Sequence, residues 1–205
     1  MKKIFLSLLF VFCSFLMFAE EGGDWIAKKI PAKLIKNNKK QVDAASVLNG
    51  KMVLLYFSAS WCGPCRNFTP ELVKFYKSTC KKENIEVVLV TSDKTENAMM
   101  KYFKKMPWYA LAFNDPAIKN LKTEFKVTGI PKLVVLDSNG KMISANGRNE
   151  VVRLGEKAAE AWKSGNIKAD DNKKADDKDS EKKSKKSKKS KKDKKSKKSK
   201  SSKKK

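Results

Sequence analysis

The sequence predicts an α/β domain in which a central mixed sheet is flanked by helices. Two nearly unbroken apolar runs, 51–57 and 85–90, are typical of strands buried on both faces beneath helices. Farther along, Asn139-Gly140 separates two shorter strand patterns and predicts a β-hairpin. Buried strands joined through helices, followed by a hairpin at the edge, indicate a layered α/β domain.

The elements follow the order β-α-β-α, then an interruption, then β-β-α. A helix is expected over 41–48, before the first buried strand. The next helix, over 62–82, contains Pro70, which removes one backbone hydrogen bond and should kink it. The remaining elements are expected as helices over 95–105 and 117–125, strands over 132–136 and 141–145, and a final helix over 151–163.

The start of the chain has the pattern of a secretory signal peptide over 1–19. A charged start precedes an apolar stretch over 4–18, and Ala19 is a suitable last residue before cleavage. An uncleaved membrane anchor is the alternative, but this stretch is shorter than the ~20 residues that span a bilayer. We therefore expect export, and a periplasmic or extracellular domain over 20–165 in which disulfides can persist.

The last part of the chain, 166–205, almost lacks large apolar side chains and carries +13 of the formal net charge of +25. Sixteen lysines lie within 182–205, so no apolar face exists to bury and we expect disorder. Such a polycation suits an anionic membrane or cell-envelope surface. Nucleic acid is a poorer partner because no aromatic side chains interleave the lysines. The alternative is a segment that is only solvated.

The run Trp61-Cys62-Gly63-Pro64-Cys65 carries the chemistry of the domain. It follows the first buried strand and opens a helix, where unpaired N–H groups and the helix dipole favour a thiolate. Such placement typically lowers a thiol pKa from about 8.5 to between about 3.5 and 7.5. Cys62, nearer the helix start, is the expected nucleophile, and Cys65 can attack a mixed disulfide formed there. The pattern indicates thiol–disulfide exchange.

Other uses of these cysteines are weaker hypotheses. A static disulfide over so short a loop would contribute little stability. Zinc would need four ligands, but the sequence has no histidine and no second cysteine pair, so no metal site is expected. Cys80 falls late in the expected helix and is interpreted as a structural or idle thiol. The absence of histidine also excludes Ser/His/Asp and Cys/His hydrolases.

Three stretches give the chain a resemblance to a known family. These are 55–70, which contains the cysteine motif; 106–113, with the run Pro107-Trp108-Tyr109; and Gly129-Ile130-Pro131. Together they resemble thioredoxin-fold proteins, and most closely the branch of tryparedoxins and nucleoredoxins. The resemblance covers roughly 25–165 and implies a thioredoxin-like fold. It also implies a thiol–disulfide oxidoreductase that needs no cofactor beyond a redox-active Cys62–Cys65 disulfide.

The resemblance also implies how substrates are met. Pro131 is expected in a cis peptide bond facing the disulfide, with the backbone of Ile130 pairing with an extended substrate segment. Gly63 and Pro64 set the geometry and redox bias of the loop. Trp61 offers a flat apolar contact to a substrate or, equally, packs into the domain. The partners are protein thiols and disulfides and an unidentified electron donor. The rival function is an envelope- or polyanion-binding protein whose lysine-rich tail carries the main role.

One position departs from ordinary thioredoxins. They carry a buried Asp six residues before the first active-site cysteine, where this sequence has Tyr56, as the tryparedoxin branch does. A phenol with a pKa near 10 is a poor base at neutral pH. The group that deprotonates Cys65 therefore stays unassigned by the sequence.

Overall fold

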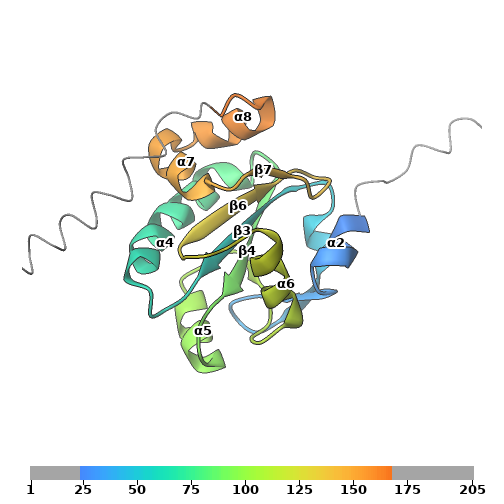
Figure 1. Ribbon diagram of the computed structural model, residues 1–205, viewed down its shortest axis with the longest axis vertical. Helices are drawn as coiled ribbons and strands as arrows, with labels where there is room; N and C mark the ends of the chain where they lie inside the picture. The colour runs from blue at the N-terminus through green and yellow to red at the C-terminus, as the bar shows by residue number, and fades with distance from the viewer. Residues whose placement is uncertain (1–23, 168–205) are drawn as a thin grey trace, which may run out of the picture. The chain divides into compact units, whose positions relative to one another are not determined.

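The computed structural model describes residues 24–167. The expected signal peptide and all but two residues of the expected basic tail lie outside the described residues. Within 24–167 a seven-stranded mixed sheet is flanked by helices, in the strand order β2-β1-β5-β4-β3-β6-β7 (Figure 1). No helix in this range has the length and apolar character needed to cross a bilayer.

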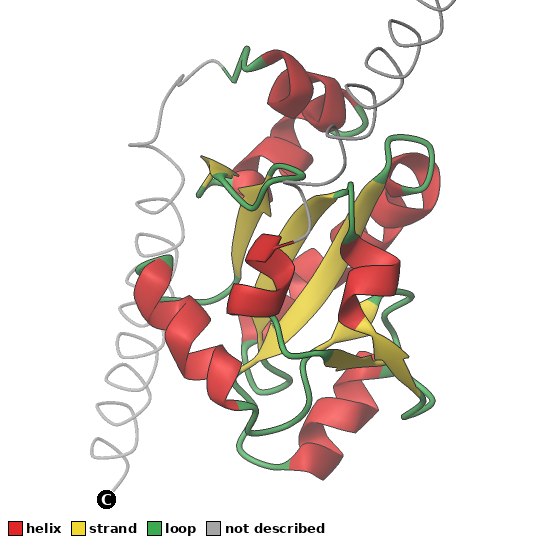
Figure 2. Ribbon diagram, turned by 90° about the vertical axis from the view of Figure 1, so that its right-hand side faces the viewer, coloured by secondary structure: helices red, strands yellow, loops and turns green. Residues whose placement is uncertain are grey.

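The strands are β1 Lys33–Ile35, β2 Gln41–Asp43, β3 Met52–Ser58, β4 Ile85–Thr91, β5 Tyr109–Ala110, β6 Lys132–Leu136 and β7 Met142–Ser144. The helices are α2 Asp24–Lys29, α3 Ala44–Leu48, α4 Gly63–Phe75, the π-helix η1 Tyr76–Cys80, α5 Glu96–Phe103, α6 Pro116–Glu124, α7 Gly147–Leu154 and α8 Lys157–Ser164. Viewed from the side, the strands run between helical layers (Figure 2).

The centre of the sheet confirms the predicted buried strands. β3 pairs in parallel with β4 and antiparallel with β6, and every residue of β3 and β4 is buried. The predicted hairpin is also confirmed, because β7 returns antiparallel along β6. Parallel strands β3 and β4 therefore bring their carboxyl ends to one edge of the sheet, where the cysteine motif follows β3.

The two faces of the sheet are packed by different helices. Val53, Leu55 and Phe57 of β3 join one apolar core with residues of α2, α3 and α6. The alternate positions of β3 point to the opposite face of the sheet. There the ring of Tyr56 packs edge to face on the ring of Phe68 of α4, with the ring centroids 5.8 Å apart. This period of two follows from the pleat of a strand. Helix α4, which begins at the cysteine motif, is thus fixed on the sheet by buried aromatic contacts.

The helix expected over 41–48 is wrong in its first half. Residues 41–43 form β2, which pairs antiparallel with β1, and only α3 is helical. Asp43 ends the strand and caps the helix, accepting a hydrogen bond from the Ser46 amide at 3.0 Å. An N-cap residue adopts extended backbone, so strand and helix meet at this residue without a loop.

Two other expected helices are divided. The predicted helix 62–82 is helical in α4 and continues as η1, with a change from α- to π-type hydrogen bonding after Phe75. The predicted helix 151–163 is two helices, α7 and α8, because Gly155 adopts φ +55° and ends the first.

Strand β5 lies in the stretch that the sequence left as an interruption. A strand of two residues is too short to produce a recognisable period.

A buried carboxyl group makes the stability of this fold depend on pH. The Glu86 side chain on β4 accepts hydrogen bonds from the Tyr76 hydroxyl at 2.9 Å and the Val87 amide at 3.0 Å. Lys51 Nζ lies 3.9 Å from it. Burial nevertheless dominates and raises the Glu86 pKa above its usual 4.5.

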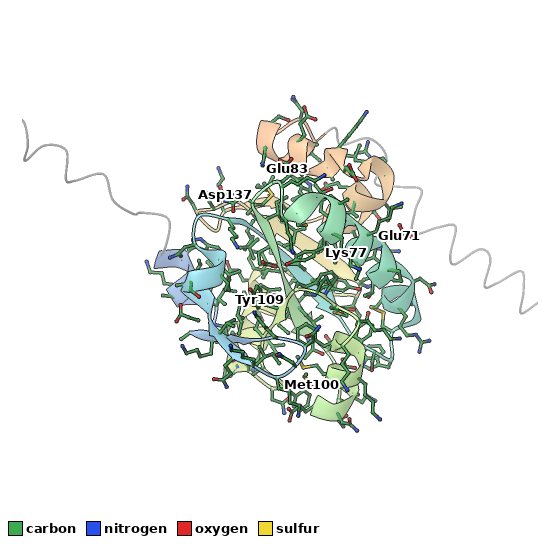
Figure 3. All side chains as sticks on the ribbon, turned by 180° about the vertical axis from the view of Figure 1, so that it is seen from behind. Glu71, Lys77, Glu83, Met100, Tyr109 and Asp137 are labelled. Carbon is green, nitrogen blue, oxygen red and sulfur yellow. A yellow bond between two sulfur atoms is a disulfide. The ribbon has the colours of Figure 1, made fainter. Side chains whose placement is uncertain are left out.

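A raised pKa means that the folded state holds the Glu86 proton more tightly than the unfolded chain does. The free energy of unfolding should therefore fall as pH rises from about 4.5 through the folded pKa. Glu86→Gln should remove this part of the pH dependence. Urea unfolding between pH 4 and 8 measures it, with Glu71→Gln at an exposed position (Figure 3) as the matched control. Equal slopes in the wild type and Glu86→Gln would contradict the assignment.

Candidate active site

The cysteine pair lies at the junction of β3 and α4. Cys62 is the N-cap of α4, and Gly63 and Pro64 form its first turn, where a proline costs no hydrogen bond. Cys62 and Cys65 are joined by a disulfide, with their Cα atoms 5.2 Å apart. The Cys65 amide donates a hydrogen bond to Cys62 Sγ at 3.2 Å. The same donor would stabilise a negative sulfur at Cys62 once the disulfide opens.

The two cysteines differ in access to solvent. Cys62 keeps 5% of its surface exposed, whereas Cys65 keeps none. Trp61, the preceding residue, is 56% exposed. Any thiolate that approaches from outside therefore reaches Cys62 before Cys65. This order of access matches the sequence prediction that Cys62 is the outer thiol of the pair.

The loop that carries Pro131 faces the disulfide. The peptide bond between Ile130 and Pro131 is cis, as the family resemblance implied. The Ile130 carbonyl oxygen lies 3.7 Å from Cys62 Sγ, and its side chain packs against the small cluster of Ala59, Cys62 and Cys65. Ile130 is only partly buried. The structure therefore brings together residues that are 68 positions apart in the chain.

Trp61 is held in place by the loop that follows β4. Its indole N–H donates to the Ser92 carbonyl at 3.1 Å. Asp93 Oδ1 accepts hydrogen bonds from the Ser60 amide at 2.9 Å and hydroxyl at 2.6 Å, and its Oδ2 accepts from Thr91. Trp61 is thus an anchored surface residue and is not part of the core.

Sequence reasoning missed Ser92 and Asp93, although a signal was present. Polar residues directly after a buried parallel strand lie at the carboxyl edge of the sheet, where sites of α/β domains form. Ser92 and Asp93 come immediately after β4, the parallel neighbour of β3. Their position alone would have placed them beside the cysteine motif.

A chain of buried hydroxyl groups lies behind Cys65. Thr69 Oγ1 donates to the Cys65 carbonyl at 2.9 Å, and the hydroxyls of Tyr56 and Tyr102 both hydrogen-bond to Thr69 Oγ1. Ser58 extends the chain to Tyr102 at 3.0 Å. These bonds tie the first turn of α4 to β3 and α5. This set of hydroxyl groups includes no carboxylate, because Tyr56 stands at the position where ordinary thioredoxins carry Asp.

Burial and the neighbouring Tyr102 raise the pKa of Tyr56 well above its usual 10, so this phenol stays protonated at neutral pH. We therefore expect Tyr56→Phe to lower the free energy of unfolding by about 2 kcal/mol, for the two hydrogen bonds that its hydroxyl makes to Thr69 Oγ1 and the Cys65 carbonyl. Activity should stay within about threefold, whereas removal of a general base costs about 10²- to 10⁴-fold. Urea unfolding and insulin-disulfide reduction measure the two effects. A hundredfold loss of activity in a stably folded variant would contradict a purely structural role.

Cys80 lies apart from this site. It is a free, fully buried thiol at the end of η1, and burial, with Glu86 nearby, raises its pKa far above the usual range. The thiol form is therefore maintained, which agrees with the structural interpretation. Within the described part of the chain, His, Cys, Asp and Glu form no cluster of three or more that could hold a metal ion.

Comparisons with known proteins identify the arrangement. Residues 49–142 match the family described as thioredoxin-like. Tryparedoxin of Trypanosoma brucei brucei is 37% identical over 139 residues, which cover 67% of this chain and 96% of that protein. Probable nucleoredoxin 1 of Arabidopsis thaliana is 46% identical over 115 residues, 56% of this chain but only 20% of the relative's length.

Solved structures agree with the sequence matches. A structure of tryparedoxin II complexed with glutathionylspermidine superimposes with a TM-score of 0.61 at 39% identity, covering 64% of this chain and 94% of that one. The order of elements, the Cys62–Cys65 disulfide and the cis Pro131 loop are thus accompanied by clear sequence similarity. The chain belongs to the thioredoxin-like family, in the branch of tryparedoxins and nucleoredoxins, whose members are thiol–disulfide oxidoreductases that use their own cysteine pair.

Proposed function

We propose that this chain is an exported oxidoreductase that reduces or exchanges protein disulfides through Cys62 and Cys65. The observation that carries the proposal is the unequal exposure of the two cysteines at a helix N-terminus. An outer sulfur can capture a substrate, and an inner one three residues away can release it. A backbone N–H already directed at Cys62 Sγ favours the thiolate that starts the reaction.

The cycle transfers two electrons. The Cys62 thiolate attacks one sulfur of a substrate disulfide, forming a Cys62–substrate bond and releasing the other substrate sulfur as a thiolate. Cys65, after losing its proton, attacks Cys62 Sγ, forms the Cys62–Cys65 disulfide and releases the second substrate thiolate. The substrate is reduced to a dithiol and the protein is oxidised. An electron donor then runs both steps in reverse: one donor thiolate attacks Cys62 Sγ and releases Cys65, and a second donor thiolate attacks the donor sulfur of this mixed disulfide and releases Cys62, so that the donor is oxidised to a disulfide and the protein returns to the dithiol.

The residues around Cys62 would contact the substrate. The exposed ring of Trp61 provides a flat apolar surface beside it. The backbone at Ile130, next to the cis Pro131, suits pairing with an extended peptide. Because tryparedoxin II has been solved with glutathionylspermidine, we propose a low-molecular-weight thiol as one candidate electron donor.

Equilibration with glutathione at a series of ratios tests the function directly. We expect a reversible two-electron couple for Cys62–Cys65, measured by trapping free thiols and separating the two forms. A potential near about −270 mV would assign a reductant, and one near about −120 mV an oxidant. The absence of a reversible couple would refute the proposed function.

Export is a separate part of the proposal, supported by the sequence pattern over 1–19. Cleavage after Ala19 would make Glu20 the first residue of the mature protein, placed in a periplasmic or extracellular space. N-terminal sequencing of the protein from its natural cells tests this. Recovery of the uncleaved chain in the cytosol would contradict it.

A second function is favoured by the sixteen lysines within 182–205. We propose that this segment binds anionic membrane or envelope surfaces, at about 1 kcal/mol per lysine near the surface. Deletion of 166–205 should abolish sedimentation with anionic vesicles while insulin reduction continues. If biological function is lost with redox activity intact, the tail carries the main role. Unchanged vesicle binding would refute the surface-binding proposal.

A further inference from the structure

A cavity of about 700 Å³ lies beside the candidate active site. It is formed by the loop after β4, by α6 and by the turn that follows α6 up to Thr128. Helices α5 and α6 lie toward the same end of the sheet, away from α8 (Figure 1). The cavity lining includes Ser92 and Asp93, which follow β4 at the edge of the sheet where the parallel strand β3 also ends.

Three contacts place the cavity next to the disulfide. Its wall includes Ser92, whose carbonyl holds the Trp61 indole at 3.1 Å, and Asp93, which holds the Ser60 amide at 2.9 Å. Its other end reaches Thr128, two residues before Ile130, whose carbonyl is 3.7 Å from Cys62 Sγ. A substrate joined to Cys62 thus has this cavity as its neighbour.

Lysines line one wall of the cavity. Lys119, Lys122 and Lys126 are spaced three and four residues apart, which places them along one side of α6 and the turn after it. None of the three has an ion-pair partner among residues 24–167. Lys122 is half-buried, and its burial lowers its pKa. An anion beside it would offset this desolvation.

The two carboxylates of the cavity lining accept hydrogen bonds from uncharged groups. Asp93 accepts three hydrogen bonds, from Ser60 and Thr91. Asp115 caps α6 through the Ala117 amide at 2.9 Å. Glu124, also on α6, lies outside the cavity lining and pairs with Lys29 of α2. These hydrogen bonds come from uncharged groups and leave both aspartates charged, so three lysines against two aspartates give the cavity lining a formal net charge of +1, with the positive groups together along α6 and the turn after it.

We propose that this cavity is a substrate subsite that selects carboxylate-bearing disulfides, seating acidic groups next to the sulfur that Cys62 attacks. The inference rests on the proposed disulfide exchange and adds its substrate class. Partly buried Ile118 and Val127 line the same cavity, so an acidic group with an apolar neighbour fits best. A polyamine, such as the spermidine part of the ligand in the tryparedoxin II structure, would bring positive charge toward these lysines.

The test compares three disulfide probes of the reduced full-length protein at pH 7. These are a cystine peptide with flanking glutamates, the same peptide with flanking serines, and glutathione disulfide. The variant is Lys119→Gln/Lys122→Gln/Lys126→Gln. The matched control, Lys77→Gln/Lys82→Gln/Lys157→Gln, removes the same charge from exposed positions on η1, before β4 and on α8.

We expect the cavity variant to lose about tenfold in kcat/KM for the glutamate peptide, as three partly exposed charge pairs would supply. The serine peptide should change by less than about twofold, and the control variant should keep the wild-type preference. Raising the salt concentration should reduce the preference for acidic probes in the wild type. If kcat/KM for glutathione disulfide also falls in the cavity variant, the subsite binds carboxylates of small thiols as well. If kcat/KM falls only for the glutamate peptide, the subsite binds acidic protein segments.

Equal losses for the acidic and serine peptides, or no loss for any probe, would overturn the subsite while leaving the disulfide exchange intact. An unchanged preference in the cavity variant together with a lost preference in the control variant would overturn it too. If the wild type reduces none of the probes, the proposed function itself fails and the subsite falls with it. A glutamate peptide with serine in place of cysteine should also inhibit competitively, with a weaker inhibition constant in the cavity variant.

Discussion

Cys62→Ser is expected to abolish insulin-disulfide reduction, to the rate seen with dithiothreitol alone. The thiolate is the nucleophile of disulfide exchange, and a serine hydroxyl at the N-cap of α4 cannot replace it. We expect a loss of at least about 100-fold. Precipitation of the insulin B chain, followed as turbidity, measures the rate. The variant should fold, because serine is a favoured N-cap residue.

Cys65→Ser is the matched partner of this experiment and should fail differently. Cys62 can still attack a substrate, but the buried position three residues on no longer carries a thiol to release it. Mixed disulfides should therefore accumulate and appear as higher bands on non-reducing gels. Cys62→Ser should show no such bands. Turnover retained in both variants, or mixed disulfides in Cys62→Ser, would contradict the division of roles.

Gly140→Ala is expected to lower the free energy of unfolding by about 3 kcal/mol or more. Gly140 adopts φ +75° in the turn between β6 and β7, a conformation that costs an alanine about 1 kcal/mol. A Cβ there would also overlap the ring of Trp25. Displacing the ring adds an overpacking cost of about 1–3 kcal/mol. It would also break the hydrogen bond from the Trp25 indole to the Ser138 carbonyl at 2.8 Å.

Gly50→Ala separates the two causes. Gly50 has a similar φ of +69°, but a Cβ there would meet no heavy atom within 4 Å. We expect it to cost about 1 kcal/mol, the backbone part alone. Urea unfolding followed by circular dichroism compares the two variants. Equal losses would show that Trp25 does not constrain the turn, and the packing of α2 on this hairpin would then need another explanation.

The elements that the sequence predicted well are those whose pattern is set by burial. β3, β4 and β6 are continuous apolar runs because helices cover both faces, and the structure places them within a residue or so of the expected bounds. β1, β2 and β5 are two or three residues long and depend on pairing with neighbours. Their formation is a tertiary effect that no local pattern records.

The residues of the candidate site also differ in how well the sequence predicts them. Cys62, Cys65 and Pro131 carry chemistry in their residue types, so a short motif was enough to select them. Asp93 accepts a hydrogen bond from the Ser60 amide, 33 positions earlier in the chain, and Thr69 donates one to the Cys65 carbonyl in the buried interior. Aspartate and threonine are common in loops and helices for other reasons, and only the fold shows what they contact.

The exposure of Trp61 also distinguishes it from the other tryptophans in how it can be labelled. Of the four tryptophans, Trp25, Trp108 and Trp162 are buried within the domain, and only Trp61 faces water, immediately before the disulfide. A water-soluble reagent that modifies indole rings would therefore reach Trp61 first in the folded protein, and the label would stand next to the two sulfurs.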